Sequence, residues 1–224
     1  MMAQEEIPKE PVKKAQIQLE EELREINLGA ELGSQKPIFI SSQLMAQEKE
    51  QLVALLQKYR DVFAWTYDKI PSLDPVLVVY SLNMDTGIRL VVQLARVFHT
   101  EVEAQIIQEA KKLLTAGFIK PIQHPKWLSN IVPVKKKNGQ ICCCVDFHNL
   151  NKTCPKDEFP LPNIHLLVDS VVASFMFSFV DGYSRYNQIR MAAKDAEKSA
   201  FRTPIGNFYY IVMPFGLKNV GATY

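Results

Sequence analysis

Apolar residues recur at helical spacing in two stretches of this chain. The first stretch begins near Ser42 and leads into the aromatic segment 61–65, which predicts a helix of about four turns with an aromatic anchor. The second begins at Thr100, where Thr100 and Glu103 have the spacing of a capping box, and Gly117 supplies a stop signal. The positions that define the two stripes are Leu44, Leu52, Leu55, Leu56 and Tyr59 in the first helix, and Val102, Ile106, Ala110, Leu113 and Leu114 in the second.

A β-hairpin is predicted around Asn138 and Gly139. Two apolar runs flank this dipeptide, and Asn-Gly between apolar runs is the strongest short-range signal for a hairpin with a type I′ turn. The hairpin would pair residues 130–136 with 141–147 and place the lysines of 135–137 at its tip. Two later apolar segments, "FMFSFVD" and "GNFYYIVMPFGLKN", are also predicted to be strands, the second breaking at Pro214 and Gly216.

The order of these segments predicts an α+β fold, because strands and helices are segregated rather than strictly alternating. Residues 1–36 mix Glu, Lys and Pro and are interpreted as a solvated tail or linker, with an amphipathic helix from about Val12 to Asn27. Residues 37–99 contain the first helix and an extended Val-rich stretch, and residues 100–224 contain the second helix and the predicted strands.

Composition adds little to this outline. The 224 residues are 47% hydrophobic with a formal net charge of +2, so a nucleic-acid partner has to be argued from local clusters and not from bulk charge. No apolar run approaches the roughly 20 residues that cross a bilayer, and membrane insertion is not expected. Four cysteines, three of them adjacent, do not form a disulfide framework, and a reducing intracellular compartment is the expectation.

The adjacent cysteines, Cys142 to Cys144, are the most unusual feature of the predicted hairpin. Neighbouring residues of a strand point to opposite faces, so the three thiols cannot converge on one ion. Their spacing also does not match a zinc site. We interpret them as small buried apolar residues.

Asp181 is the candidate metal ligand, because it ends an apolar strand beside a glycine and two tyrosines. A single acid at a strand end is more often a turn or cap residue, so the surrounding motifs decide between the two interpretations. Those motifs are "GFIKPIQHPKWLSNIVPVKKKNGQ", "CVDFHNLNKTCPKDEFPLP", "FVDGYSRYNQI" and "EKSAFRTPIGNFYYIVMPFGLKNVGATY".

In this order and spacing the four motifs resemble the reverse transcriptase of gypsy-type long-terminal-repeat retrotransposons, particularly those of plants, over about residues 36 to 224. The resemblance implies the fingers and partial palm of a right-hand polymerase, which holds an RNA or DNA template-primer and a dNTP. Two Mg²⁺ ions would serve nucleotidyl transfer in the intact family.

The resemblance also assigns roles to individual residues. Asp181 is similar to the first catalytic aspartate and would bind Mg²⁺. The expected nucleotide contacts are Lys135, Lys136, Cys142, Arg185, Tyr186 and Phe215, and the expected template-primer grip is Trp127, Asn130 and Asp146. Without the resemblance, the lysines are equally well explained as a solvated run and Tyr186 as a core aromatic residue.

Three positions depart from the family pattern. Cys142 and His148 stand where an arginine is usual, and Arg185 stands where a small residue is usual. A thiol cannot replace a planar guanidinium with five donors. The sequence also stops before the Tyr-X-Asp-Asp motif, so we expect a polyprotein fragment without polymerase activity. The alternatives are a non-catalytic nucleic-acid-binding remnant and a decayed reading frame with no selected role.

Overall fold

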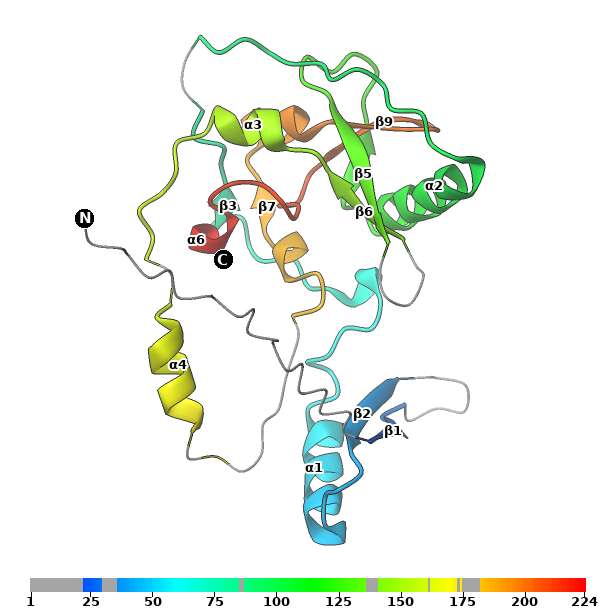
Figure 1. Cartoon of the computed structure of the whole chain (residues 1–224), viewed down its shortest axis with the longest axis vertical. Coiled ribbons are helices and arrows are strands. Elements are labelled where there is room, and N and C mark those ends of the chain that lie inside the picture. The colour runs from blue at the N-terminus through cyan, green and yellow to red at the C-terminus, as the bar shows by residue number, and fades with distance from the viewer. Residues whose placement is uncertain are drawn as a thin grey trace, which may run out of the picture. The chain divides into compact units, whose positions relative to one another are not determined.

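The chain forms two compact units that divide between Phe63 and Ala64 (Figure 1). The computed structural model describes residues 22–29, 36–84, 87–135, 141–160, 162–172, 174 and 182–224. The sequence analysis instead placed boundaries after residues 36 and 99. Each unit is built from its own strands and helices.

The first unit contains an antiparallel pair of strands and one helix. β1 (Leu23–Asn27) pairs with β2 (Pro37–Ser41), and α1 (Ala46–Lys58) follows. The predicted amphipathic helix over 12–27 is therefore wrong for residues 23–27, because these residues make ladder hydrogen bonds with β2 instead of local helical ones. Residues 23–27 of the predicted tail therefore belong to a sheet. The helix predicted from Ser42 onward is confirmed by α1.

A five-stranded sheet forms the centre of the second unit, in the order β4-β9-β8-β5-β6. Its neighbours pair antiparallel except for β5 and β8, which are parallel. This order makes β6 an edge strand. The strands are β4 (Ile119–Pro121), β5 (Ser129–Lys135), β6 (Ile141–Val145), β8 (Phe201–Thr203) and β9 (Gly206–Tyr210).

The predicted hairpin is confirmed by the pairing of β5 with β6. Ile131 lies opposite Val145, and Lys135 lies opposite Ile141. The turn residues Asn138 and Gly139 lie outside the described residues, as does the predicted strand over 175–181. The strand predicted within 206–219 is confirmed as β9, which ends at Tyr210.

The helix α2 (Thr100–Thr115) confirms the second helix and packs against β4, β6 and β8. Ile106 and Ala110 of the predicted stripe are buried. The predicted capping box is wrong, since the helix begins one residue earlier, with His99 at the N-cap position and Thr100 already helical. Gly117 ends the helix as predicted: it has a φ of +72°, a conformation that glycine adopts without steric cost.

The rest of the second unit consists of short elements around the sheet (Figure 1). β3 (Val79–Tyr80) pairs in parallel with β7 (Arg190–Met191). The helices are η1 (Tyr67–Lys69), α3 (His148–Lys152), α4 (Ile164–Val171), η2 (Arg185–Gln188), α5 (Ala193–Ala196), η3 (Glu197–Ser199) and α6 (Val220–Thr223). Within the described parts of the chain, no helix is long and apolar enough to cross a membrane.

Aromatic and aliphatic side chains from the sheet, α2 and α3 meet in one core. Their complete burial explains why the short strands remain paired, since each large side chain contributes about 1.5–3 kcal/mol by leaving water. The largest of them are Trp127, Tyr80, Phe147, Phe201, Ile106, Ile119, Leu150, Ile189 and Met213.

A buried carboxylate joins α5 to the segment after β3. Asp195 is 1% exposed, and its two oxygens accept hydrogen bonds from the backbone N–H of Leu82 at 3.0 Å and from Lys198 Nζ at 2.7 Å. A carboxylate withdrawn from water is stable only with such partners. Asp195 therefore fixes the β3–β7 pair beside the core.

We expect Asp195→Ala to lower the free energy of unfolding by about 2–4 kcal/mol, because it leaves the Leu82 N–H without its acceptor and removes the Lys198 pair. Urea denaturation of the wild type and the variant measures this loss. Asp68→Ala is the matched control, since Asp68 pairs with Lys69 on the surface at 3.8 Å and should change nothing measurable. Equal effects of the two substitutions would contradict the structural role of Asp195.

Candidate functional site

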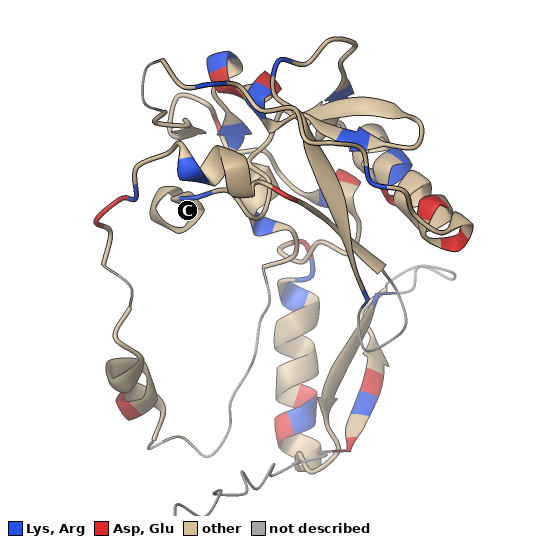
Figure 2. Ribbon diagram, turned by 45° about the horizontal axis from the view of Figure 1, so that its top comes forward, with Lys and Arg blue, Asp and Glu red and all other residues tan. Residues whose placement is uncertain are grey.

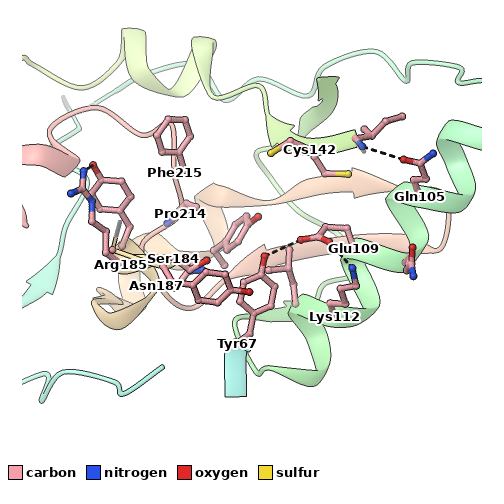
Figure 3. Close-up of a pocket in the computed structure, with 18 residues that line it drawn as sticks. Tyr67, Gln105, Glu109, Lys112, Cys142, Ser184, Arg185, Asn187, Pro214 and Phe215 are labelled. Carbon is pink, nitrogen blue, oxygen red and sulfur yellow. Dashed lines mark hydrogen bonds and ion pairs between the residues drawn. The ribbon is translucent and has the colours of Figure 1, made fainter. Parts of the chain in front are cut away.

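A pocket of about 1060 Å³ lies between α2, the edge strand β6 and the segment 182–187 (Figure 3). Its remaining walls come from η1, the end of β9 and residues 214–215. Segments far apart in the sequence therefore border a single cavity. A cavity of this size is at the upper end of the range for small-molecule sites.

Four of the residues that resemble nucleotide contacts line this pocket: Cys142, Arg185, Tyr186 and Phe215. The resemblance had grouped these residues as nucleotide contacts, and their role in nucleotide binding stays a prediction. Lys135, by contrast, is exposed at the end of β5 and does not line the pocket. Lys136 and Asp181 lie outside the described residues.

Arg185 lies against two aromatic rings at the edge of the pocket. The centre of its guanidinium is 5.0 Å from the ring centroid of Tyr186 and 5.0 Å from that of Tyr224. One guanidinium nitrogen also donates to the Tyr186 hydroxyl at 3.2 Å. Cation–π contacts of this kind contribute about 0.5–1 kcal/mol each at exposed sites. The side chain therefore covers ring surface that would otherwise be open to a planar ligand.

The turn that carries Arg185 depends on a close approach to Gly182. A Cβ at position 182 would lie 3.0 Å from Cδ and 3.1 Å from Cβ of Arg185. Ser184, between them, adopts a left-handed backbone conformation with a φ of +45°. Glycine at 182 leaves room for the Arg185 side chain to fold back over its own turn.

On the α2 side of the pocket, Glu109 is the central charged group. Its carboxylate accepts a hydrogen bond from the Tyr67 hydroxyl at 3.1 Å and pairs with Lys112 at 3.6 Å (Figure 3). On the same helix, Gln105 Oε1 accepts the backbone N–H of Ile141 at 3.2 Å, which ties α2 to the first residue of β6. This wall is polar and has side chains of both signs.

The weakly acidic groups around Glu109 are held in their neutral forms. Burial, followed by the Glu109 charge, raises the pKa of Tyr67 and of Tyr183. The same two causes raise the pKa of the Cys143 thiol to about 11 and raise the pKa of the buried Tyr210. At neutral pH these groups can donate protons in hydrogen bonds but do not act as bases.

The template-primer grip predicted at Trp127, Asn130 and Asp146 stays a prediction, and the structure shows the surroundings of these residues. Trp127 is 2% exposed and Asn130 is 5% exposed, so neither side chain is open to a nucleic acid. Asn130 instead donates from Nδ2 to the Leu94 carbonyl at 2.6 Å. Asp146 is more accessible and pairs with Arg96 at 3.1 Å. Asn130 thus ties the start of β5 to the segment before α2, while Trp127 is part of the core.

The described residues contain no group of three or more His, Cys, Asp or Glu side chains that could hold a metal ion. Only Asp181 was predicted as a metal ligand, and its position is not described. The three cysteines of β6 do not form such a group either. The interpretation that three adjacent thiols cannot meet at one point agrees with Cys143 packing against the core.

The sequence analysis did not identify Glu109 as a pocket residue, although its position on the apolar stripe of α2 was a signal. Val102, Ile106 and Leu113 define a stripe on α2, and position 109 falls on that stripe, three residues after Ile106 and four before Leu113. A glutamate on an apolar stripe needs a polar partner, and here Tyr67 supplies it. Tyr67 itself carried no pattern that separated it from its aromatic neighbours.

We expect the raised pKa of the Cys143 thiol to change how the free energy of unfolding depends on pH. An unfolded Cys143 thiol titrates near 9.0 and the folded one at about 11, so its contribution is complete below pH 9 and is lost as the pH rises toward 11. The free energy of unfolding of the wild type should then fall more steeply between pH 9 and 11 than that of Cys143→Ala. The tyrosines are common to both proteins and cancel in the difference. Parallel curves over this interval would contradict the shifted pKa.

No family model matches the sequence. Among curated proteins, the chain is 26% identical over 186 residues to the "Retrovirus-related Pol polyprotein from transposon 297" of Drosophila melanogaster, a match covering 81% of this chain. It is 37% identical over 131 residues to the corresponding polyprotein from transposon opus of the same organism, covering 55% of this chain. The matched regions are 17% and 12% of those polyproteins, so the chain spans a small part of the length of its relatives.

The solved structures establish the fold. The foamy viral protease-reverse transcriptase in complex with double-stranded DNA matches 80% of this chain with a TM-score of 0.59 and 20% identity. The same protein with an RNA/DNA hybrid matches 80% of this chain with a TM-score of 0.54 and 18% identity. The matches cover 31% and 24% of those chains. The α+β fold of this chain is thus similar to that of part of the foamy viral protease-reverse transcriptase.

Proposed function

We propose that this chain is part of an RNA-directed DNA polymerase of a gypsy-type retrotransposon, in which it forms the nucleotide pocket and contacts the template-primer. The observation that carries the proposal is the convergence of Cys142, Arg185, Tyr186 and Phe215 in one cavity of a reverse-transcriptase-like fold. Three separate segments of the chain supply these residues. These segments are distant in the sequence, and the four side chains meet only in the folded chain.

The proposed ligand of the pocket is a deoxynucleoside triphosphate. Tyr186 and Phe215 lie with their ring centroids 6.2 Å apart, and flat apolar surfaces of this kind suit a sugar and a base. Tyr186 would close against the sugar, as the resemblance implies. Among the pocket-lining residues of the described chain, Lys112 is a cationic side chain that could meet the phosphates, whereas the guanidinium of Arg185 is held over Tyr186 and Tyr224.

The proposal includes Mg²⁺, because Asp181 is similar to a catalytic aspartate that would bind this ion. Hard oxygen ligands suit this ion, and Mg²⁺ would neutralise the charge that develops during nucleotidyl transfer. Because the described residues supply no cluster of metal-binding side chains, this role rests on Asp181 by resemblance alone. The described residues of the pocket would bind and orient the nucleotide.

The proposed nucleic-acid contact is the β5–β6 hairpin. Figure 2 shows acidic and basic residues together on α1 and α2, so the helices offer no surface of a single sign. The sequence has three consecutive lysines at 135–137, and Lys135 is exposed at the end of β5. Phosphate neutralisation by such residues is independent of base sequence.

A non-catalytic nucleic-acid-binding role is the second candidate. The observation that favours it is the position of Arg185 over Tyr186 and Tyr224, where it competes with a nucleotide for the rings. Binding of a template-primer without nucleotide turnover would fit this arrangement. The two candidates differ in whether a deoxynucleotide enters the pocket.

We expect the chain to bind a primed template with an affinity that falls with salt. Replacing Lys135, Lys136 and Lys137 by Ala should reduce the slope of log K against log salt by about 2–3, because each lysine releases about one counterion on binding phosphate. Fluorescence anisotropy with a labelled RNA/DNA hybrid measures the slope. Replacing Lys58, Lys69 and Lys194 by Ala removes the same charge elsewhere and should leave the slope nearly unchanged. Equal slopes for the two triple variants would refute the hairpin as the contact.

We expect Arg185→Ala to bind deoxynucleoside triphosphates about tenfold more tightly than the wild type. A ligand that stacks on Tyr186 or Tyr224 must first displace the guanidinium, and two cation–π contacts together amount to about 1–2 kcal/mol. Isothermal titration calorimetry measures the affinity, and Arg190→Ala, an exposed arginine on β7, is the control. Weaker binding by Arg185→Ala would show instead that its charge holds the phosphates.

A further inference from the structure

Two of the three adjacent cysteines meet on one face of β6. Cys142 and Cys144 are two residues apart, so their side chains leave the strand on the same side, and their sulfur atoms lie 4.0 Å apart. Cys143 leaves on the opposite side, where it packs against the core and is influenced by the Glu109 charge of α2. Cys142 and Cys144 thus form a pair, and Cys143 is separate from it.

The pair is accessible from outside the protein. Cys142, Cys143 and Cys144 are all half-buried, and both Cys142 and Cys143 line the pocket. β6 is also the edge strand of its sheet. A small reagent can therefore reach the Cys142 sulfur without unfolding of the sheet. The fourth cysteine, Cys154, is 3% exposed and donates to the Leu150 carbonyl.

A disulfide is a poor match for this geometry. Residues i and i+2 of a strand are separated by about 6.7 Å between Cα atoms, whereas disulfides mostly span about 5.5–6 Å and rarely exceed about 6.8 Å. Closing the bond would bend β6 at Cys143, between the two residues that face Val134 and Val132 of β5. The ladder with β5 opposes that bend.

A single bridging atom fits the pair better than a direct bond. With bonds of about 2.3 Å to sulfur, two thiolates are about 3.8 Å apart on a tetrahedral centre and about 3.5 Å apart on a pyramidal one such as trivalent arsenic. The observed sulfur–sulfur distance of 4.0 Å is close to both values, and a small rotation of the two side chains closes the difference. The described residues provide no third His, Cys, Asp or Glu for the pair, and a centre that accepts two protein ligands suits two thiols.

We propose that Cys142 and Cys144 form a two-sulfur binding site for thiophilic metal and metalloid centres, represented by trivalent arsenicals. The hydrated form of phenylarsine oxide carries two hydroxyl groups on arsenic. Two As–O bonds break and two As–S bonds form, each thiol proton leaves with a hydroxyl group as water, and no electrons are transferred. The site shares Cys142 with the proposed nucleotide pocket, but binding of an arsenical does not require that the pocket binds a nucleotide.

Intact-mass spectrometry of the reduced full chain with phenylarsine oxide tests the proposal. An excess of a monothiol competes with single cysteines but not with a chelating pair, because the second As–S bond forms intramolecularly. We expect one phenylarsenic adduct per chain. Cys142→Ala and Cys144→Ala should each weaken it at least about tenfold, whereas Cys143→Ala and Cys154→Ala should retain it.

Circular dichroism of each variant separates loss of the site from loss of the fold, and Cys142→Ser and Cys144→Ser provide second variants at the same positions. Absence of an adduct in the folded wild type would overturn the proposal. Loss of the adduct in a folded Cys143→Ala variant would also overturn it, since this would place the arsenic between adjacent cysteines. Retention of the adduct in Cys142→Ala or Cys144→Ala would also overturn the proposal, because one cysteine of the pair would then be dispensable.

Discussion

The hydrogen bonds of Asn130 at the start of β5 are the constraint on which the second unit depends. Its backbone N–H donates to Gln93 Oε1 at 2.8 Å, its side chain donates to the Leu94 carbonyl, and its carbonyl accepts the N–H of Asp146 at 2.9 Å. Three segments are joined at one buried residue. An unpaired polar group there would cost about 1–3 kcal/mol, so none of the segments can shift alone.

The pocket follows from this junction. β5 pairs with β8 on one side and with β6 on the other, so fixing its first residues fixes the line along which β6 runs. Gln105 of α2 then holds the first residue of β6, and Glu109 faces the same cavity one turn later. The walls of the pocket are consequently rigid on the α2 and β6 sides. The opposite wall is a turn, which Gly182 allows to fold tightly beneath Arg185.

The distribution of charge in the pocket differs from what the resemblance implies. Position 142 carries a thiol where an arginine is usual, while Arg185 brings a guanidinium to the other side of the same cavity. The Arg185 guanidinium lies against both Tyr186 and Tyr224, whose rings meet edge to face, and it therefore covers ring surface on that side of the pocket. The substitution at 142 has a second consequence, since it creates the pair with Cys144. One strand position thereby changes both the electrostatics and the chemistry of the site.

The sequence by itself determined the elements with strong local signals: α1, α2 with its stop at Gly117, and the pairing of β5 with β6. The linked motifs also indicated the fold, because their order and spacing constrain much more than one pattern does. Local signals failed at β1, where pairing with β2 decides the conformation, and at the N-terminus of α2, where the helix begins one residue early.

Only the tertiary structure decided which side chains meet. It buried Trp127 and Asn130, brought Glu109 to Tyr67, and placed Arg185 over two rings, since these outcomes depend on contacts between distant segments. The cysteines illustrate both contributions. Alternation along a strand separates Cys143 from its neighbours on sequence grounds alone. The 4.0 Å between the sulfurs of Cys142 and Cys144 depends on side-chain rotamers and on the packing of β6, which no local pattern encodes.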